Sequence, residues 1–322
     1  MREPAITVVI PALNAGKVIA DTLTSVRQQT FRNWDAIVVL DDGSTDDTAE
    51  IVRQFTQVDP RFRLIQQKER GIAAARNRAI AEARGEFIAF LDADDVWLPM
   101  KLEKQIKLFE SGQRIDVAFT NFYYWDGQKD SKPFYGPGRP LPSGNLDEQI
   151  VYSISRFCPT MSVHLMRKKT LAEAGLFDAN EPTVEDWDLW LRMAEHGLWV
   201  AGISEPLARY RQWAGNTTKQ KLKCARANVL ALMKNLDLSK RADLRRHYAR
   251  ALSIHKSNVE LIRTRELIEA RTDGVARQIL RAWRSNPRKI KWLLRSGLAA
   301  WPDSLGGRYF KGMVYRKIVH RY

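Results

Sequence analysis

Short runs of apolar residues alternate with amphipathic segments along the first hundred residues. The run 6–10 is rich in β-branched residues, and the segment 18–26 that follows has its apolar residues on one helical face. The same alternation predicts strands at 36–40, 63–66 and 87–91, and helices at 50–55 and 72–83. Because strands that alternate with crossover helices form a parallel, doubly wound sheet, the pattern predicts an α/β fold.

Two helix boundaries carry local signals. Ser44 precedes Asp47 by three residues, which predicts that Ser44 caps the helix through 50–55. Gly85 follows the Ala-rich helix and is predicted to be its C-terminal cap, since glycine adopts left-handed backbone angles without strain.

Beyond residue 97 the chain divides into two parts. A helix is predicted around 98–109, an aromatic-rich strand at 117–125, a Gly- and Pro-interrupted loop at 126–143 that could cover an acceptor, regular structure again at 161–171, and a helix from 185 packed on the body. From about residue 218 the pattern is almost entirely helical and rich in Arg and Lys. We therefore predict an α/β domain at 1–217 and a basic α-helical extension at 218–322.

Composition adds limits on size and location. With 322 residues, 44% of them hydrophobic, the chain can bury one large α/β core and a smaller unit. No apolar run approaches the roughly 18 to 20 residues that span a bilayer, and the N-terminus has no signal-peptide pattern, so we expect a cytoplasmic protein. Cys158 and Cys224 lack metal-ligand spacing and are predicted to be ordinary reduced thiols.

The positive charge is concentrated in the C-terminal third. Residues 219–322 carry 26 Lys and Arg against 7 Asp and Glu, a net charge of +19, which leaves −4 for residues 1–218. Such a tail favours an anionic partner, either a membrane surface or an acidic polymer. A solvated basic helical face explains the charge equally well.

Polar residues follow three of the predicted strands, at 11–14, 41–44 and 92–95. In doubly wound sheets the ligand lies beyond the carboxyl ends of the strands. Asp92 and Asp94, separated only by Ala93, can share one divalent cation, Mn²⁺ or Mg²⁺, and its bound diphosphate. A solvated turn is the alternative, but a third carboxylate, Asp95, adds repulsion that a cation would offset.

Further residues are candidates for binding a nucleotide donor. Asp41 and Asp42 suit hydrogen bonding to a nucleobase, although a turn with a helix cap also explains them. Pro11, Ala12 and Asn14 are predicted to line the same pocket.

Glu185 and Asp186 precede or begin the Trp-rich helix, where the helix dipole favours negative charge even in a structural role. Functionally, Asp186 is predicted to be the general base that removes a proton from an acceptor hydroxyl. Glu185 is a candidate for the acceptor or diphosphate side, and Arg76 and Arg211 are candidates to add positive charge around the diphosphate.

The order of these motifs resembles the family 2 glycosyltransferases, the inverting GT-A group. The likeness covers about residues 4–213, and its motifs lie at 8–14, 38–46, 74–77, 85–95 and 185–192. The resemblance implies a GT-A fold, with a mostly parallel sheet, and a UDP-sugar donor. It also implies that Asp42 binds the nucleobase, that Asp92 and Asp94 bind the ribose and the metal-diphosphate, and that Asp186 is the catalytic base. In-line displacement would invert the anomeric configuration.

The resemblance also implies partners and one departure. A saccharide or lipid-linked acceptor is expected. Because a membrane-associated acceptor is common in polymer-assembling relatives, the tail is interpreted as a peripheral anchor at the inner face of the cell membrane. The residues after Tyr210 and Arg211 are Gln-Trp-Ala-Gly, whereas the family often has a His at this point. The chain therefore departs from the family pattern in the loop on the acceptor side.

Three rival functions fit the sequence less well. A metal-dependent nucleotidyltransferase would need a basic, Gly-rich loop after the first strand, but 11–16 has one glycine. A dinucleotide oxidoreductase would need a Gly-x-Gly-x-x-Gly motif after a strand, and none of the predicted strands is followed by one. A nucleic-acid-binding protein could use the basic tail but would not require acidic strand ends, so no specific nucleic acid is expected.

Overall fold

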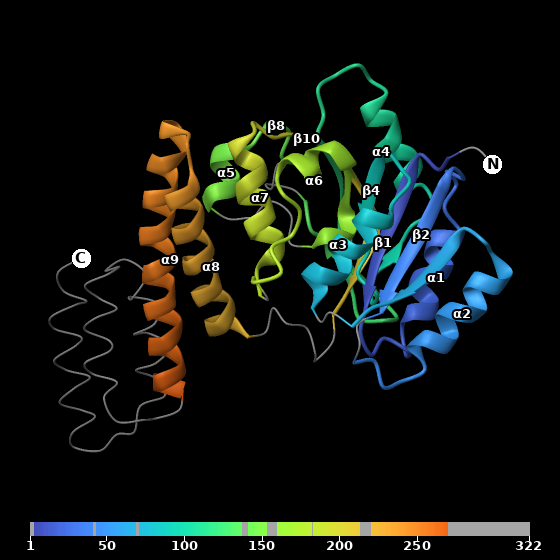
Figure 1. Cartoon of the computed structure of the whole chain (residues 1–322). Helices are drawn as coiled ribbons and strands as arrows, with labels where there is room; N and C mark the ends of the chain where they lie inside the picture. The colour runs from blue at the N-terminus through green and yellow to red at the C-terminus, as the bar shows by residue number, and fades with distance from the viewer. Residues whose placement is uncertain are drawn as a thin grey trace, which may run out of the picture.

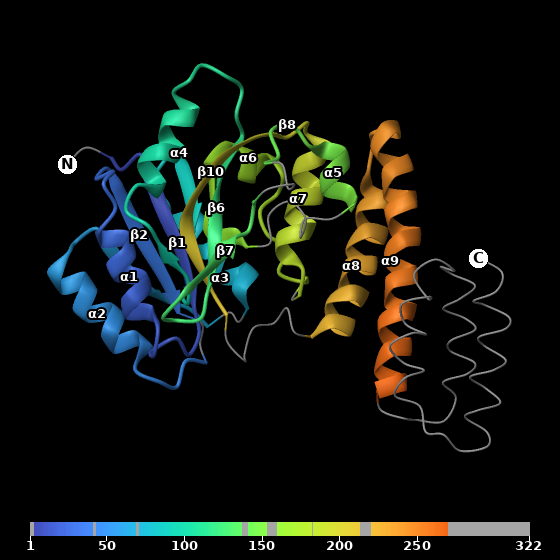
Figure 2. The same ribbon diagram turned by 180° about the vertical axis from the view of Figure 1, so that it is seen from behind.

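The computed structural model describes residues 3–40, 43–68, 71–136, 141–152, 160–181, 183–212 and 220–269. A β-sheet flanked by helices forms the body, and a long helical hairpin stands beside it (Figure 1). The view from behind shows the same hairpin separated from the sheet by α5 and α7 (Figure 2). Predictions that concern Asp41, Asp42, Cys158 and residues 270–322 fall outside the described residues.

Ten strands and nine α-helices occur in the described residues. The strands are β1 Ile6–Ala12, β2 Trp34–Leu40, β3 Phe62–Gln66, β4 Phe87–Phe90, β5 Val96–Trp97, β6 Val117–Trp125, β7 Asp130–Pro133, β8 Gly144–Asn145, β9 His164–Arg167 and β10 Trp199–Arg211. The helices are α1 Ile19–Arg27, α2 Thr48–Val58, α3 Ile72–Glu82, α4 Lys101–Phe109, α5 Asp147–Tyr152, α6 Lys168–Glu173, α7 Glu185–Glu195, α8 Lys221–Leu238 and α9 Ala242–Glu269, with a 3-10 turn, η2, at Met161–Val163.

The sheet has the order β3-β2-β1-β4-β9-β6-β10-β5. Its first four strands run parallel, as the βα alternation predicts, and β10 also runs parallel to β6. The sheet becomes mixed because β9 is inserted antiparallel between β4 and β6. Strands β1 and β2 are buried along their whole length, which explains their continuous apolar sequences. The carboxyl ends of β1, β2 and β4 therefore meet at one edge.

Ser44 does not cap a helix, so that local prediction was wrong. Helix α2 begins later, at Thr48, and Asp46 accepts a hydrogen bond from the Thr48 backbone N–H at 3.2 Å. The Ser44 hydroxyl oxygen instead accepts from the Asn14 N–H at 3.1 Å, joining the loops after β1 and β2. The cap-like spacing thus reflects a contact between two loops.

Gly85 is not a left-handed helix cap either. A Cβ atom at this position would lie 2.5 Å from the Thr7 nitrogen and 2.7 Å from the Ile6 carbonyl carbon. Glycine is needed because the chain passes directly against β1, and the Gly85 N–H donates to the Thr7 hydroxyl at 2.9 Å. In addition, the predicted loop 126–143 contains a strand, β7, which pairs with β6.

The helical hairpin shares its core with the body. Leu232, Leu244 and Tyr248 are 0% exposed and belong to the same apolar cluster as the sheet. The predicted boundary at 217 lies within a stretch, 213–219, outside the described residues, so the two-domain division stays a prediction. Among the helices of the described residues, none combines the length and hydrophobicity needed to cross a membrane.

Candidate active site

Arg76 joins the two acidic motifs. This α3 side chain is only 2% exposed, and its guanidinium donates to Asp92 Oδ1 at 2.9 Å and to Glu185 Oε1 at 2.8 Å. Burial disfavours its charge, but the carboxylates of Asp92 and Glu185 outweigh that effect and raise the pKa of Arg76. The buried guanidinium of Arg76 therefore joins the loop after β4 to the first turn of α7.

Asp186 has the proton affinity of a base that works near neutral pH. Burial, reinforced by the negative charge of Glu185, raises the pKa of Asp186 to about 7. Its Oδ1 accepts from the Trp187 N–H at 2.7 Å, which fixes the carboxylate to the first turn of α7. The residue is half-buried, between the buried Glu185 and Trp187.

The loop after β4 is anchored by Ser162. The Asp92 N–H donates to the Ser162 hydroxyl oxygen at 3.0 Å, and that hydroxyl donates to Asp95 Oδ2 at 2.5 Å. Asp95 is fully buried; burial and the charges of Asp94 and Asp92 raise its pKa well above its usual range. The buried carboxyl of Asp95 therefore anchors the loop through its hydrogen bond to Ser162, while Asp92 and Asp94 remain partly exposed.

Arg211, at the end of β10, also holds this loop. Its N–H donates to Asp95 at 2.9 Å and its Nε to the Asp94 carbonyl at 2.8 Å, while the guanidinium pairs with Asp21 at 2.9 Å. Arg211 thus lies at the predicted site but is engaged by protein groups. Sequence patterns missed Asp21 and Ser162, because neither lies in a motif and each reaches the site through a contact distant in sequence.

A cavity of about 480 Å³ opens at the end of β1. Pro11, Ala12 and Asn14, all predicted donor-binding residues, line it together with Leu13, Gly43, Gly71 and Ile72. Asn14 has a left-handed φ of 49°, and its side-chain oxygen accepts from the Thr45 N–H at 2.8 Å. Ile72, which lines the cavity, begins α3, and Arg76 follows one turn later on the same helix.

Within the described residues, no group of three or more His, Cys, Asp and Glu is arranged to hold a metal ion. Asp92 and Asp94 are two carboxylates on one loop, and one Asp92 oxygen already accepts from Arg76. Such a pair fits Mg²⁺ or Mn²⁺ when phosphates and waters complete the coordination, as is usual for Mg²⁺ with nucleotides. The donor set therefore suits a cation that arrives with its substrate.

Sequence comparisons relate the chain to known glycosyltransferases. The sequence model of the protein family described as glycosyl transferase family 2 matches residues 7–173 of this chain. TuaG of Bacillus subtilis, whose name assigns it provisionally to teichuronic acid biosynthesis, is 32% identical over 227 residues, covering 70% of this chain and 85% of TuaG. WfaP of Escherichia coli, a UDP-Glc:α-D-GlcNAc-diphosphoundecaprenol β-1,3-glucosyltransferase, is 30% identical, with the same coverage. The chain spans only 30% of a glycosyltransferase from Rickettsia bellii that is 31% identical.

Solved structures confirm the predicted fold. S. aureus TarS 1-349, in complex with UDP-GlcNAc, matches with a TM-score of 0.65 and 17% identity, covering 98% of this chain and 91% of that TarS fragment. The mannosyltransferase PcManGT of Pyrobaculum calidifontis, in complex with GDP-Man and Mn²⁺, matches with a TM-score of 0.62 and 18% identity, covering 97% and 84%. The fold is GT-A, with a helical C-terminal segment.

Proposed function

Since this chain belongs to glycosyl transferase family 2, we propose that it transfers a sugar from a nucleotide-diphosphate donor to a hydroxyl of a saccharide or lipid-linked saccharide. The observation that carries this proposal is the cluster in which Arg76 holds Asp92 and Glu185 beside Asp186, whose pKa is about 7. Binding of UDP-GlcNAc by TarS and of GDP-Man by PcManGT supports a nucleotide-sugar donor. UDP is the expected nucleotide.

The donor would bind along the cavity at the end of β1. Pro11, Ala12 and Asn14 are assigned to the nucleotide, as are Asp41 and Asp42, which lie outside the described residues. Asp92, Ala93 and Asp94 are assigned to the ribose and diphosphate. Arg76 holds Asp92 in place, and Arg211 holds the carbonyl of Asp94.

Asp92 and Asp94 are the residues that would hold Mn²⁺ or Mg²⁺. When bound, the cation neutralises charge on the departing diphosphate. PcManGT, with Mn²⁺ and GDP-Man bound, supports the use of a divalent cation. Arg76 stays cationic beside Asp92 and limits the repulsion between carboxylates before a cation enters.

Asp186 would accept the proton from the acceptor hydroxyl. A base with a pKa of about 7 is largely ionised above neutral pH and still has the affinity to take a proton as the oxygen attacks. One carboxylate that activates one hydroxyl gives a single in-line displacement, and hence inversion at the anomeric carbon. Glu185, next to it, is paired with Arg76 and raises the proton affinity of Asp186 by its charge.

The acceptor is proposed to be a lipid-linked saccharide of cell-envelope polysaccharide synthesis. WfaP acts on a diphosphoundecaprenol-linked sugar, and TuaG is named for a wall polymer. Neither a nucleotidyltransferase nor a nucleic-acid-binding protein is favoured by these comparisons.

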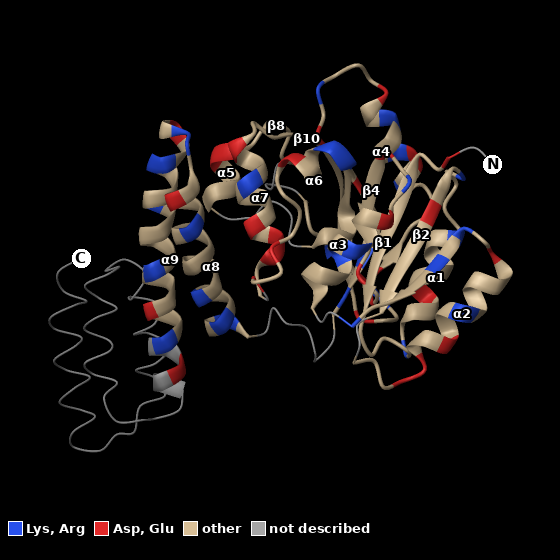
Figure 3. Ribbon diagram, viewed as in Figure 1, with Lys and Arg blue, Asp and Glu red and all other residues tan. Residues whose placement is uncertain are grey.

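The basic C-terminal segment is proposed to hold the protein at an anionic membrane surface. Basic residues recur along α8 and α9 (Figure 3), and the exposed ones on α9 include Arg245, Arg246, Arg250 and Lys256. Each basic residue near an anionic surface adds about 1 kcal/mol of attraction. Flotation with anionic and neutral liposomes tests this proposal, and equal recovery with both would exclude it.

A donor screen tests the enzymatic proposal. UDP-, GDP- and dTDP-sugars are supplied with Mn²⁺ or Mg²⁺, and a short-chain lipid carrying GlcNAc diphosphate, or water, serves as acceptor. We expect Asp94→Ala to lose metal-dependent donor binding. Asp186→Asn should bind donor normally but transfer sugar roughly 10²- to 10⁴-fold more slowly, because it lacks the base.

Two outcomes would contradict these roles. Transfer by Asp186→Asn at the wild-type rate would remove Asp186 as the base. Unchanged donor binding by Asp94→Ala with and without metal would remove Asp94 as a metal ligand.

A further inference from the structure

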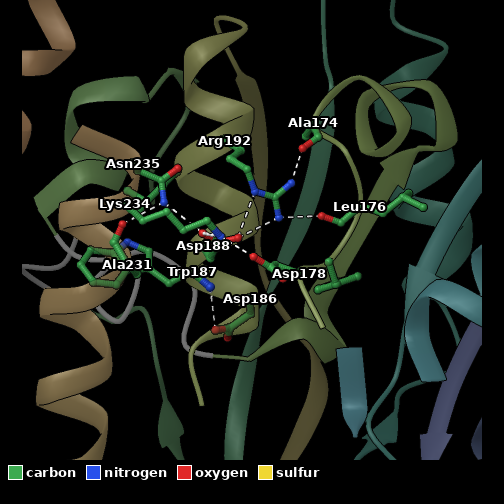
Figure 4. A network of polar contacts seen from close by, with 12 residues as sticks. Ala174, Leu176, Asp178, Asp186, Trp187, Asp188, Arg192, Ala231, Lys234 and Asn235 are labelled. Carbon is green, nitrogen blue, oxygen red and sulfur yellow. Dashed lines mark hydrogen bonds and ion pairs between the residues drawn. The ribbon is translucent and has the colours of Figure 1, made fainter. Parts of the chain in front are cut away.

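Helix α7 carries a fully buried carboxylate two residues beyond the proposed base. Asp188 is 0% exposed, and an isolated buried charge costs several kcal/mol unless cations or hydrogen-bond donors surround it. Its partners come from α7 itself and from α8 of the C-terminal hairpin (Figure 4). The catalytic helix therefore contains a charge that the C-terminal hairpin helps to compensate.

The two oxygens of Asp188 have different partners. Arg192, one turn further along α7, binds Oδ2 at 2.9 Å. The Lys234 ammonium and the Asn235 amide, both on α8, donate to Oδ1 at 2.9 and 3.0 Å. Charge-assisted bonds of this length are stronger and more directional than apolar contacts. They define the position of α8 along α7.

The same groups hold the segment that leads into α7. Lys234 also donates to Asp178 at 2.6 Å. Arg192 donates to the carbonyl oxygens of Ala174 and of Leu176, the latter at 2.6 Å. Both the start of α7 and its preceding segment are thus joined to one lysine of α8.

The hairpin contacts the C-terminal half of α7 as well. Arg241, between α8 and α9, donates to the Ala194 carbonyl at 2.9 Å and pairs with the buried Asp147 at 2.6 Å. The Tyr248 hydroxyl, on α9, donates to the Leu191 carbonyl at 3.1 Å. Helix α7 is therefore fixed at both ends by residues that follow it by about 40 positions or more in the sequence.

Any movement of α7 would move the proposed base. Asp186 is bonded to the Trp187 N–H, so its carboxylate follows the first turn of the helix. The first turn of α8 lies within electrostatic range of this carboxylate: partial burial raises the pKa of the Cys224 thiol, and the negative charge of Asp186 adds to that effect.

We propose that the α8–α9 hairpin positions Asp186, and that Lys234 and Asn235 are positioning residues that act on transfer through Asp188. This inference rests on the proposed transferase function. Apolar packing alone allows small sliding movements, whereas bonds to a buried carboxylate select one register. A displacement of about 1 Å at a reacting group can cost roughly 10²-fold in rate.

Kinetics of four α8 variants in the full chain test the proposal, with the best donor from the screen above and the same acceptors. We expect Lys234→Met to lower kcat by roughly 10- to 100-fold with no change in donor KM. Asn235→Ala, which leaves Lys234 and Arg192 around Asp188, should lower kcat less. Lys234→Arg should restore the wild-type rate, because it can still donate to Asp178 and Asp188. Asp237→Asn, at an exposed position of the same helix, is the control and should be silent.

The outcomes separate positioning from simple support of the fold. A parallel fall in kcat, donor affinity and thermal midpoint would overturn the inference, as would wild-type kcat in Lys234→Met. If Lys234→Met does not fold, wild-type kcat in Asn235→Ala overturns it. A wild-type protein that turns over none of the donors refutes the proposed function instead, and the positioning role falls with it.

Discussion

The loops after β1 and β4 and the first turn of α7 carry the residues of the proposed site, but they are held in place by different parts of the chain. The loop after β1 is bonded to the next βα unit, where Asp46 accepts from the Gly16 N–H at 2.8 Å and Ser44 from the Asn14 N–H. Helix α7 is bonded to a hairpin that begins more than 25 residues after its own end. The proposed donor side is thus part of a repeating βα pattern, whereas the proposed base depends on later residues with no motif of their own.

Arg76 is the direct link between the two sides, so its removal should have the largest effect. Arg76→Met leaves the carboxylates of Asp92 and Glu185 without their shared cation, and we expect the free energy of unfolding to fall by about 3–5 kcal/mol. Urea denaturation measures this change. Arg78→Met, on the same helix, removes an exposed i,i+4 pair with Glu82 and should cost only about 0.3–0.5 kcal/mol. Equal costs for the two variants would mean that the buried pair does not hold the two sides together.

Ser162→Ala tests the donor side alone. The substitution leaves the Asp92 N–H and the buried Asp95 carboxyl without their shared hydroxyl, at an expected cost of about 1–3 kcal/mol in unfolding free energy. We also expect weaker metal-dependent donor binding, measured by calorimetry with UDP and Mn²⁺. Ser111→Ala, which removes an exposed hydroxyl bonded to a local carbonyl, should leave both quantities unchanged. Normal donor binding by Ser162→Ala would show that the loop keeps its shape without this anchor.

The pH dependence of transfer tests the base side alone. Burial and Glu185 raise the pKa of Asp186 to about 7, and only the ionised form can accept a proton. The transfer rate should therefore fall about tenfold for each pH unit below 7, while donor affinity does not follow the same curve. Initial rates between pH 5 and 8 give the profile, and the residual rate of Asp186→Asn should not show this fall below pH 7. A flat wild-type profile over that range would contradict the assignment.

The strands that border the proposed donor side could be predicted because their sequence information is local. Each apolar run that gave β1, β2 or β4 is buried on both faces, and the polar residues after it necessarily meet at the sheet edge. The predicted roles of Ser44 and Gly85 were wrong because the local sequence does not distinguish a helix boundary from other contacts. Ser44 makes a contact between two loops, and Gly85 allows a close approach to β1. Those contacts join residues 30 and 78 positions apart.

The elements around the proposed base, Asp186, were predictable only in part. The motif at Glu185 and Asp186 indicated a helix with a catalytic carboxylate, but Lys234 resembles any basic residue of a solvated helix. Its docking to Asp188 depends on the three-dimensional path of the chain, as does the insertion of β9. Strand β10 was also missed, because Gly202, Ser204, Glu205 and Pro206 interrupt its apolar alternation.

The position of β9 has a consequence for how the chain assembles during synthesis. Strands β1 to β4 can pair as soon as they emerge, but the outer edge of β4 has no partner until residue 167 has been made. An open strand edge is a template for pairing with other chains. Since non-local strand pairing is slow and partly folded chains aggregate through such edges, we expect nascent chains that end between β4 and β9 to be the form most dependent on chaperones.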